Sequence, residues 1–198
     1  NGAGKTTLLG ILTGQNTKDA GTVTYGGEPV WENRAVLDNL CFSRELSAAT
    51  AAGQNGMKVQ DYLRAGATFY PRWDAAYAQR LLDQFGLPAA SRKKAVGKLS
   101  KGQMSMVTIM IALASRAPVT ILDEPVAGLD VVARELFYRL LLADYAETGR
   151  TFILSTHIIE EAAKVFERVV ILDEGRILAD EPTEELVDQF RYLSGPDA

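Results

Sequence analysis

The chain has 198 residues, a length that allows one domain of ordinary size, or one domain with a smaller appended lobe, around a sizeable core. Hydrophobic residues make up 47% and charged residues 23% of the sequence, which excludes a disordered or fibrous protein. The net charge is -4 and no run of five or more Lys or Arg occurs, so we expect no nucleic acid among the partners.

Cysteine content and hydropathy narrow the class further. Cys41 is the single cysteine, which excludes an internal disulfide and a multi-cysteine zinc site in these residues and fits a reducing cytosol. The longest apolar stretch, near residues 104–114, is well short of the ~20 residues that span a bilayer. If a membrane is involved in the function, we expect a partner to supply it.

The start of the sequence predicts a glycine-rich turn, a helix and a small hairpin. Apolar residues recur at helical spacing over residues 6–12, and Gly14 provides a C-terminal stop. Residues 22–25 alternate in polarity and are followed by Gly26 and Gly27, which favours an antiparallel hairpin.

The next part of the chain predicts a helical lobe. Residues 61–65 and 74–85 have helical patterns, and the Ala-, Gly- and Asn-rich residues 48–56 are typical of a loop. We interpret residues 39–103, approximately, as a lobe inserted into a single domain that spans residues 1–198.

The remainder alternates between helices and short apolar strands. Helices are predicted over residues 103–115, 131–147, 158–166 and 183–192, and strands over residues 119–122, 151–154, 169–172 and 176–179. Strands separated by helices imply a buried, mostly parallel sheet. The predicted fold class is therefore α/β, with an inserted helical lobe and a partial antiparallel β region.

The first seven residues match all but the first two positions of a phosphate-binding loop. Gly2 and Gly4 lack side chains, so backbone N–H groups can converge on phosphate oxygens at the positive end of the following helix. We expect Lys5 to reach the β- and γ-phosphates, Thr6 to bind Mg²⁺ and Thr7 to offer another donor. The alternative is a chance glycine-rich helix cap. The predicted nucleotide-binding residues of this motif are Asn1, Gly2, Ala3, Gly4, Lys5, Thr6 and Thr7.

Two acidic residues follow the apolar strand at residues 119–122, where α/β folds bind ligands. Asp123 is the expected partner of Mg²⁺, through water. Glu124 is then placed to orient and deprotonate an attacking water, a role typically worth about 10²- to 10⁴-fold in rate. A solvated acidic turn before Pro125 is the alternative. The only histidine, His157, follows the strand at residues 151–154, and taken alone it favours a structural role.

A resemblance to a known family rests on the order of several motifs. Residues 99–103, Leu-Ser-Lys-Gly-Gln, resemble the LSGGQ signature of ABC ATPases. Residues 127–130, Ala-Gly-Leu-Asp, resemble the D-loop, and residues 155–157, Ser-Thr-His, resemble the H-loop. With the phosphate loop and the acidic strand, five motifs stand in the order typical of that family. The sequence is therefore identified as a member of the ABC ATP-binding cassettes over nearly its whole length.

The resemblance implies a P-loop NTPase core and a dimer. In such cassettes two copies pair head to tail, as a homodimer or a heterodimer, and each signature covers the nucleotide of the other. Ser100, Gly102 and Gln103 would then act on the ATP of the partner cassette. Asp130 would couple the two sites. His157 would contact the γ-phosphate, so the functional interpretation replaces the structural one for this residue.

The resemblance also implies hydrolysis of MgATP to ADP and phosphate, which would power solute transport through a separate polytopic membrane permease. The expected location is the cytoplasm, at the inner face of the cell membrane, and the resemblance favours export over import. One rival is an ABC ATPase that moves no solute, such as a translation, chromosome or DNA-repair factor. Those relatives have a second cassette, long coiled coils or zinc modules, for which this sequence offers no residues. A nucleotide-binding regulator without catalysis is disfavoured by Glu124.

Three departures from the family pattern stand out. Lys101 occupies a position where the commonest signature has Gly, and either phosphate contact or solvation would suit it. Glu45 lies where the Q-loop normally has glutamine, and we expect it to face the metal. The sequence begins at Asn1, inside a motif, so we expect the opening glycine of the loop, the strand that feeds it and the adenine-stacking aromatic residue to precede it. A chain that starts at Asn1 is expected to bind MgATP poorly.

Overall fold

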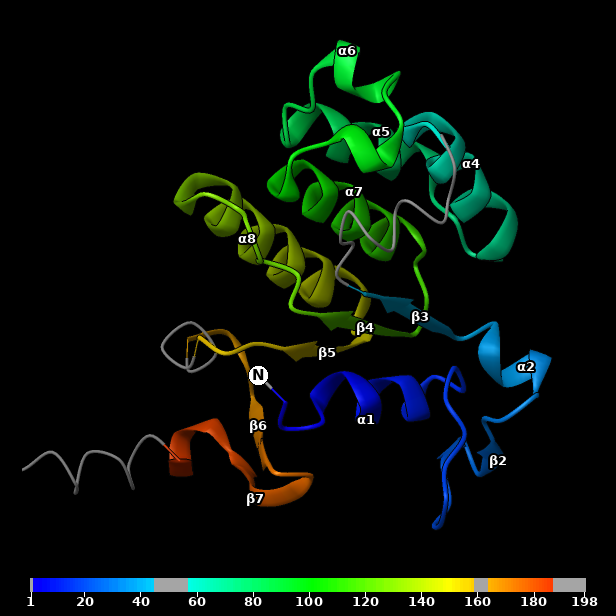
Figure 1. Cartoon of the computed structure of the whole chain (residues 1–198), viewed down its shortest axis with the longest axis vertical. Coiled ribbons are helices and arrows are strands. Elements are labelled where there is room, and N and C mark those ends of the chain that lie inside the picture. Colours follow the sequence, from blue (N-terminus) through cyan, green and yellow to red (C-terminus); the bar gives the residue numbers. More distant parts are fainter. Residues whose placement is uncertain (1, 45–56, 159–163, 187–198) are drawn as a thin grey trace, which may run out of the picture.

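A computed structural model of the chain describes residues 2–44, 57–158 and 164–186. Asn1, Glu45 and most of the helix predicted over residues 158–166 lie outside this part. Figure 1 shows a sheet of short strands in the middle, helices on both sides of it, and a helical lobe at one end.

Three strands form a parallel sheet in the order β3-β4-β5. They are β3 (Leu40–Ser43), β4 (Val119–Asp123) and β5 (Thr151–Ser155). The central strand β4 is almost fully buried because it has a strand on each side and helices on its faces. The register pairs Asp123 with Ser155, so the carboxyl ends of β4 and β5 coincide. The predicted parallel sheet is confirmed for the strands at residues 119–122 and 151–154, whereas the strand predicted over residues 169–172 belongs to a separate antiparallel pair.

Helices cover both faces of this sheet (Figure 1). On one side lie α7 (Lys101–Ala114) and α8 (Val131–Thr148), and on the other lies α1 (Lys5–Leu12). Most of α7 is buried because it is enclosed by the sheet on one side and by the lobe on the other. Its apolar side chains therefore surround the helix instead of forming one stripe.

The lobe contains helices α4 (Val59–Phe69), α5 (Ala75–Gln84) and α6 (Ala89–Arg92) and the 3₁₀ helix η1 (Val96–Lys98). The helix α5 packs its buried residues, among them Leu81 and Leu82, against α7. One part of the predicted lobe lies elsewhere: residues 40–43 are strand β3 and pair with β4 in the sheet. The short run Leu-Cys-Phe-Ser is apolar, and such runs do not distinguish strand from helix by their period.

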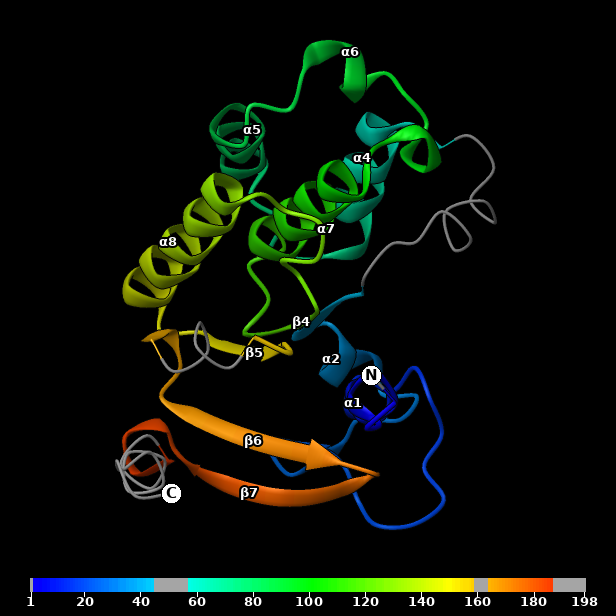
Figure 2. The same cartoon turned by 60° about the vertical axis from the view of Figure 1, so that its left-hand side comes forward.

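Two antiparallel pairs complete the described structure. The predicted hairpin is confirmed by β1 (Thr24–Tyr25) and β2 (Glu28–Pro29), with Gly26 and Gly27 both at positive φ in the turn. The longer pair is β6 (Arg168–Asp173) and β7 (Arg176–Pro182), which lie together below the parallel sheet in Figure 2. A short helix α2 (Arg34–Leu37), capped by the Asn33 side chain, connects the first hairpin to β3.

A buried group of charges joins the lobe to the core. Asp144 on α8 accepts hydrogen bonds from Arg150 Nε at 2.8 Å and Arg150 Nη2 at 2.6 Å. Arg116 Nη1 lies 3.1 Å from Asp144 Oδ1, although its hydrogen is not aligned for a hydrogen bond. The Arg116 guanidinium also stacks over Tyr77 of α5, 4.1 Å from the ring centre, and its Nη2 lies 3.4 Å from Asp74. Burial raises the pKa of Tyr77 to about 12.

Candidate active site

The phosphate loop has the conformation that its glycines allow. Gly2 has φ 95° and Gly4 has φ 96°, values in the left-handed region that side chains disfavour. Gly4 is the N-cap of α1 and offers no side chain to its first turn, so the backbone donors there stay available to an anion. The N–H of Gly175, in the β6–β7 turn, donates to the Ala3 carbonyl oxygen at 3.0 Å and supports the loop from the other side.

The hydroxyl of Thr6 meets the first acidic residue. Thr6 Oγ1 donates to Asp123 Oδ2 at 2.6 Å, and Asp123 is only 5% exposed. A hydroxyl and a carboxylate are hard oxygen ligands, and Mg²⁺ is usually held by one or two such groups together with phosphate and water. The residues present therefore fit Mg²⁺.

The second acidic residue is held between a lysine and the histidine. Glu124 Oε1 lies 3.9 Å from Lys5 Nζ, and Glu124 Oε2 lies 2.8 Å from His157 Nδ1. An ionised carboxylate can only accept, so a hydrogen bond here pairs ionised Glu124 with a His157 ring that has its proton on Nδ1. The Glu124 side chain is 16% exposed and that of His157 is 64% exposed. A carboxylate in this position can accept a proton from a water molecule that contacts its solvent-exposed part.

The sequence pattern did not identify Ser155 as a functional residue. Its hydroxyl donates to Asp123 Oδ1 and accepts from the Glu124 N–H. The signal that could have found it is positional, since Asp123 and Ser155 each end an apolar strand of one parallel sheet.

The signature and the D-loop form a second packed unit. Ser100 caps α7 by accepting from the Gln103 N–H at 3.2 Å, and the Gln103 side chain accepts from the Ser100 N–H at 3.3 Å. A Cβ atom on Gly102 would come within 2.6 Å of the Gly128 carbonyl oxygen, so only glycine fits there. Asp130 caps α8 by accepting from the Ala133 N–H at 2.8 Å.

The predicted site residues thus fall into two groups. Lys5, Thr6, Asp123, Glu124 and His157 are linked by short contacts. The signature and Asp130 have other partners, and among the described residues no hydrogen bond or ion pair joins Ser100 to the first group. The predicted site residues Asn1 and Glu45 lie outside the described part.

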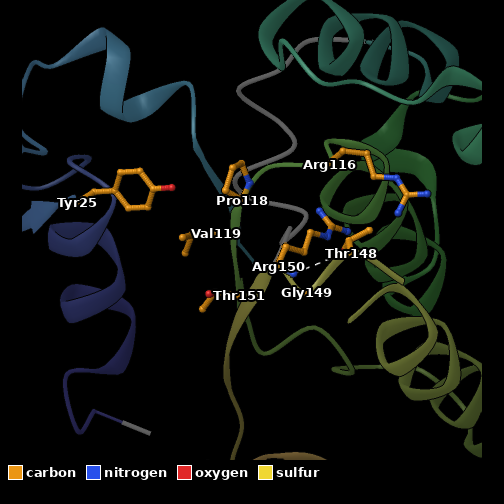
Figure 3. A pocket seen from close by; sticks show the side chains of 8 residues that line it. All are labelled: Tyr25, Arg116, Pro118, Val119, Thr148, Gly149, Arg150 and Thr151. Carbon is orange, nitrogen blue, oxygen red and sulfur yellow. Dashed lines mark hydrogen bonds between the residues drawn. The ribbon is translucent and has the colours of Figure 1, made fainter. Parts of the chain in front are cut away.

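A pocket of about 450 Å³ lies at the opposite edge of the sheet, at the amino ends of β4 and β5 (Figure 3). It is lined in part by Tyr25, Val119 and Thr151. Arg116 and Arg150 also border it, but both contact Asp144. Asp123 and Glu124 lie at the carboxyl end of β4, so this pocket is distinct from the candidate active site.

Comparison with known proteins decides the family. A family model described as "ABC transporter" matches residues 1–127 of the chain. The chain belongs to the ABC transporter family. The Nod factor export ATP-binding protein I of Burkholderia lata is 34% identical over 194 residues, which cover 95% of this chain and 61% of that protein. The thiamine import ATP-binding protein of a Jannaschia species is 31% identical and is covered to 81% of its length, with 94% of this chain aligned.

Solved structures confirm the predicted fold of this ABC cassette. An ATP-binding subunit of an ABC transporter superposes with a TM-score of 0.79 at 25% identity, over 98% of this chain and 80% of that chain. A dimeric cassette bound to ADP and phosphate superposes with a TM-score of 0.73 at 21% identity, over 91% of this chain and 81% of that one, and supports the fold alone. Within the described ranges, no helix is both long enough and apolar enough to cross a membrane.

Proposed function

We propose that this chain hydrolyses MgATP as one cassette of a dimer that powers solute transport through a separate membrane permease. The observation that carries the proposal is the convergence of Lys5, Thr6, Asp123, Glu124 and His157 at one edge of the sheet. The relatives named above are ATP-binding proteins of an exporter and of an importer, and the chain spans about three fifths of the export protein.

Each residue of this group has a separate role in the proposed hydrolysis, set by its chemistry. The loop N–H groups and the Lys5 ammonium bind the phosphates, which replace the Lys5 to Glu124 contact at 3.9 Å. Glu124 accepts a proton from the attacking water. His157 holds the carboxylate through its Nδ1–H and is exposed enough to turn toward a phosphate. Mg²⁺, when bound near Thr6 and Asp123, supplies charge neutralisation for the phosphates.

The partners follow from the two groups of residues. Within the described residues, Ser100 bonds to the first turn of α7 and Asp130 to the first turn of α8, and we propose that both complete the site of another copy, either identical or different. The permease would place the pair at the cytoplasmic face of the membrane, and we favour export. An adjacent gene for a polytopic membrane protein would support this assignment, whereas an isolated gene would favour an ABC ATPase that moves no solute.

The hydrolytic role is tested by Glu124→Gln in the native polypeptide that contains this sequence. The amide cannot accept the proton of water, so turnover should fall by about 10²- to 10⁴-fold. ATP affinity should be retained, and ATP should trap a dimer that elutes early in size-exclusion chromatography. Glu147→Gln, on the exposed part of α8, is the matched control and should leave turnover unchanged. Near-normal ATPase activity of Glu124→Gln together with a persistent monomer would contradict the proposal.

A further inference from the structure

A buried serine hydroxyl connects the two acidic residues of the active site. Ser155 Oγ donates a hydrogen bond to Asp123 Oδ1 at 2.5 Å and accepts one from the Glu124 N–H at 2.9 Å. The same N–H also faces the Ser155 carbonyl oxygen at 3.2 Å. Ser155 is 6% exposed and Asp123 is 5% exposed, so water competes poorly for these bonds. In such surroundings successive hydrogen bonds strengthen one another.

The bonds orient the Asp123 carboxylate and hold the backbone of Glu124. Asp123 Oδ1 faces Ser155, which leaves Oδ2 for the Thr6 hydroxyl at 2.6 Å. Glu124 has φ 48°, a conformation uncommon for a residue with a side chain. The chain turns there, directly after β4, and the two acceptors on Ser155 hold the Glu124 N–H in place. The Glu124 side chain is thereby directed to Lys5 and His157.

We propose that Ser155 is a positioning residue that aligns the metal-side carboxylate of Asp123 with the general base Glu124. The inference rests on the proposed function, because it concerns the same site. Ser155 acts through its neighbours: it orients Asp123 for Mg²⁺ and holds the turn that presents Glu124 to water. Loss of a residue that orients a metal ligand typically costs 10- to 100-fold in metal affinity or activity. Removal of the hydroxyl should therefore weaken the response to Mg²⁺ and slow turnover together.

The test compares three substitutions at Ser155 in the native polypeptide. Ser155→Ala removes the hydroxyl, Ser155→Cys keeps the volume but replaces a strong donor by a weak one, and Ser155→Thr keeps the hydroxyl. Ser115→Ala is the matched control, because Ser115 is 1% exposed and its hydroxyl bonds to the Ala112 carbonyl oxygen, away from the site. Calorimetry measures ATP binding with excess EDTA and with Mg²⁺, steady-state kinetics measures kcat against Mg²⁺ concentration, and circular dichroism checks folding.

We expect Ser155→Ala and Ser155→Cys to bind metal-free ATP as the wild type does. Their half-saturating Mg²⁺ concentration should rise, and their kcat should fall, by about 10- to 100-fold. Ser155→Thr should restore most of both, and Ser115→Ala should change neither. If Ser155→Ala is poorly folded, the Cys and Thr variants still decide the question.

Two results would overturn the inference. One is an unchanged Mg²⁺ dependence and kcat in both the Ala and the Cys variants. The other is an equal loss of metal-free and Mg²⁺-supported binding, which would indicate a purely structural role. If the wild type binds MgATP without hydrolysing it, the proposed function fails, while calorimetry with and without Mg²⁺ still tests Ser155.

Discussion

The buried ion pair between Asp144 and Arg150 provides a sharp test of what stabilises the core. The perturbation is Asp144→Ala in α8. The wild-type side chain is fully buried and accepts two hydrogen bonds from Arg150, at 2.6 and 2.8 Å. Arg150 is itself buried and donates further to the Leu113 carbonyl oxygen at 3.0 Å. The substitution therefore leaves one guanidinium buried without a counter-charge.

The magnitude can be worked out in two ways. Each hydrogen bond to a charged group contributes roughly 1.5–3 kcal/mol, so the loss of two amounts to about 3–6 kcal/mol. Removal of one partner from a buried ion pair typically costs about 3–5 kcal/mol, which agrees. For a chain of this size each kcal/mol lowers the melting temperature by about 2–4 °C, so a decrease of about 6–20 °C is expected.

The assay is urea and thermal unfolding followed by circular dichroism. Asp180→Ala is the matched control, because Asp180 also pairs with an arginine at 2.6 Å, but both side chains are more than half exposed. Its unfolding midpoint should not change measurably. The double variant Asp144→Leu with Arg150→Met should unfold between the wild type and Asp144→Ala, since apolar replacement removes both charges at once. Equal midpoints for Asp144→Ala and Asp180→Ala would refute the reasoning.

Two further predictions concern the signature and the cap of α5. Ser100→Arg should block hydrolysis while the same subunit still binds ATP, because in the proposed dimer the signature would act on the nucleotide of the neighbour; loss of ATP binding by the isolated monomer, at unchanged stability, would contradict this. Asp74 accepts the Tyr77 N–H at 2.7 Å, and this bond, followed by the Arg116 guanidinium, lowers the pKa of Asp74. Asp74→Ala should therefore cost about 0.5–2 kcal/mol at pH 7. A carboxylate with a lowered pKa stabilises the fold above its unfolded pKa of about 3.9, and this contribution is lost as the pH falls through the folded value. Urea midpoints should accordingly differ between wild type and Asp74→Ala at pH 7, and the difference should shrink progressively as the pH falls below about 3.9, whereas a pH-independent difference would show that the charge is not involved.

The regular part of the fold could be predicted from local patterns. Helix α8 and strands β4 and β5 begin and end within about one residue of the predicted ranges, because Asp130 and Gly149 are caps with recognisable chemistry. Strand β3 was not separated from the lobe. Its partner β4 is distant in the sequence, and the pairing of two distant strands produces no pattern in the residues next to either strand. The approximate boundaries of the lobe, as a unit, stay a prediction.

The candidate site could be predicted at positions where the residue type and its place in the pattern already indicate the chemical role. A lysine after two glycines, and two acids after an apolar strand, have few other uses, and the structure brings them together. Ser155 could not be selected in this way, since its role comes from the register that sets it opposite Asp123. The positive φ of Glu124 could not be predicted from the sequence either, because glutamate does not favour this backbone conformation.

The signature and the D-loop are separated by more than 20 residues in the sequence but pack directly against each other in the structure. Ser105 Oγ donates to the Ala127 carbonyl oxygen at 2.6 Å, and Gly102 lies against the Gly128 carbonyl group. A side chain at residue 102 would push these segments apart, because its Cβ would meet backbone atoms that cannot rotate away. Asp130 follows Gly128 by two residues and caps α8, so it adjoins the same packed segments. The amino end of α7, the turn at residues 127–129 and Asp130 are therefore packed together in one unit of the described structure.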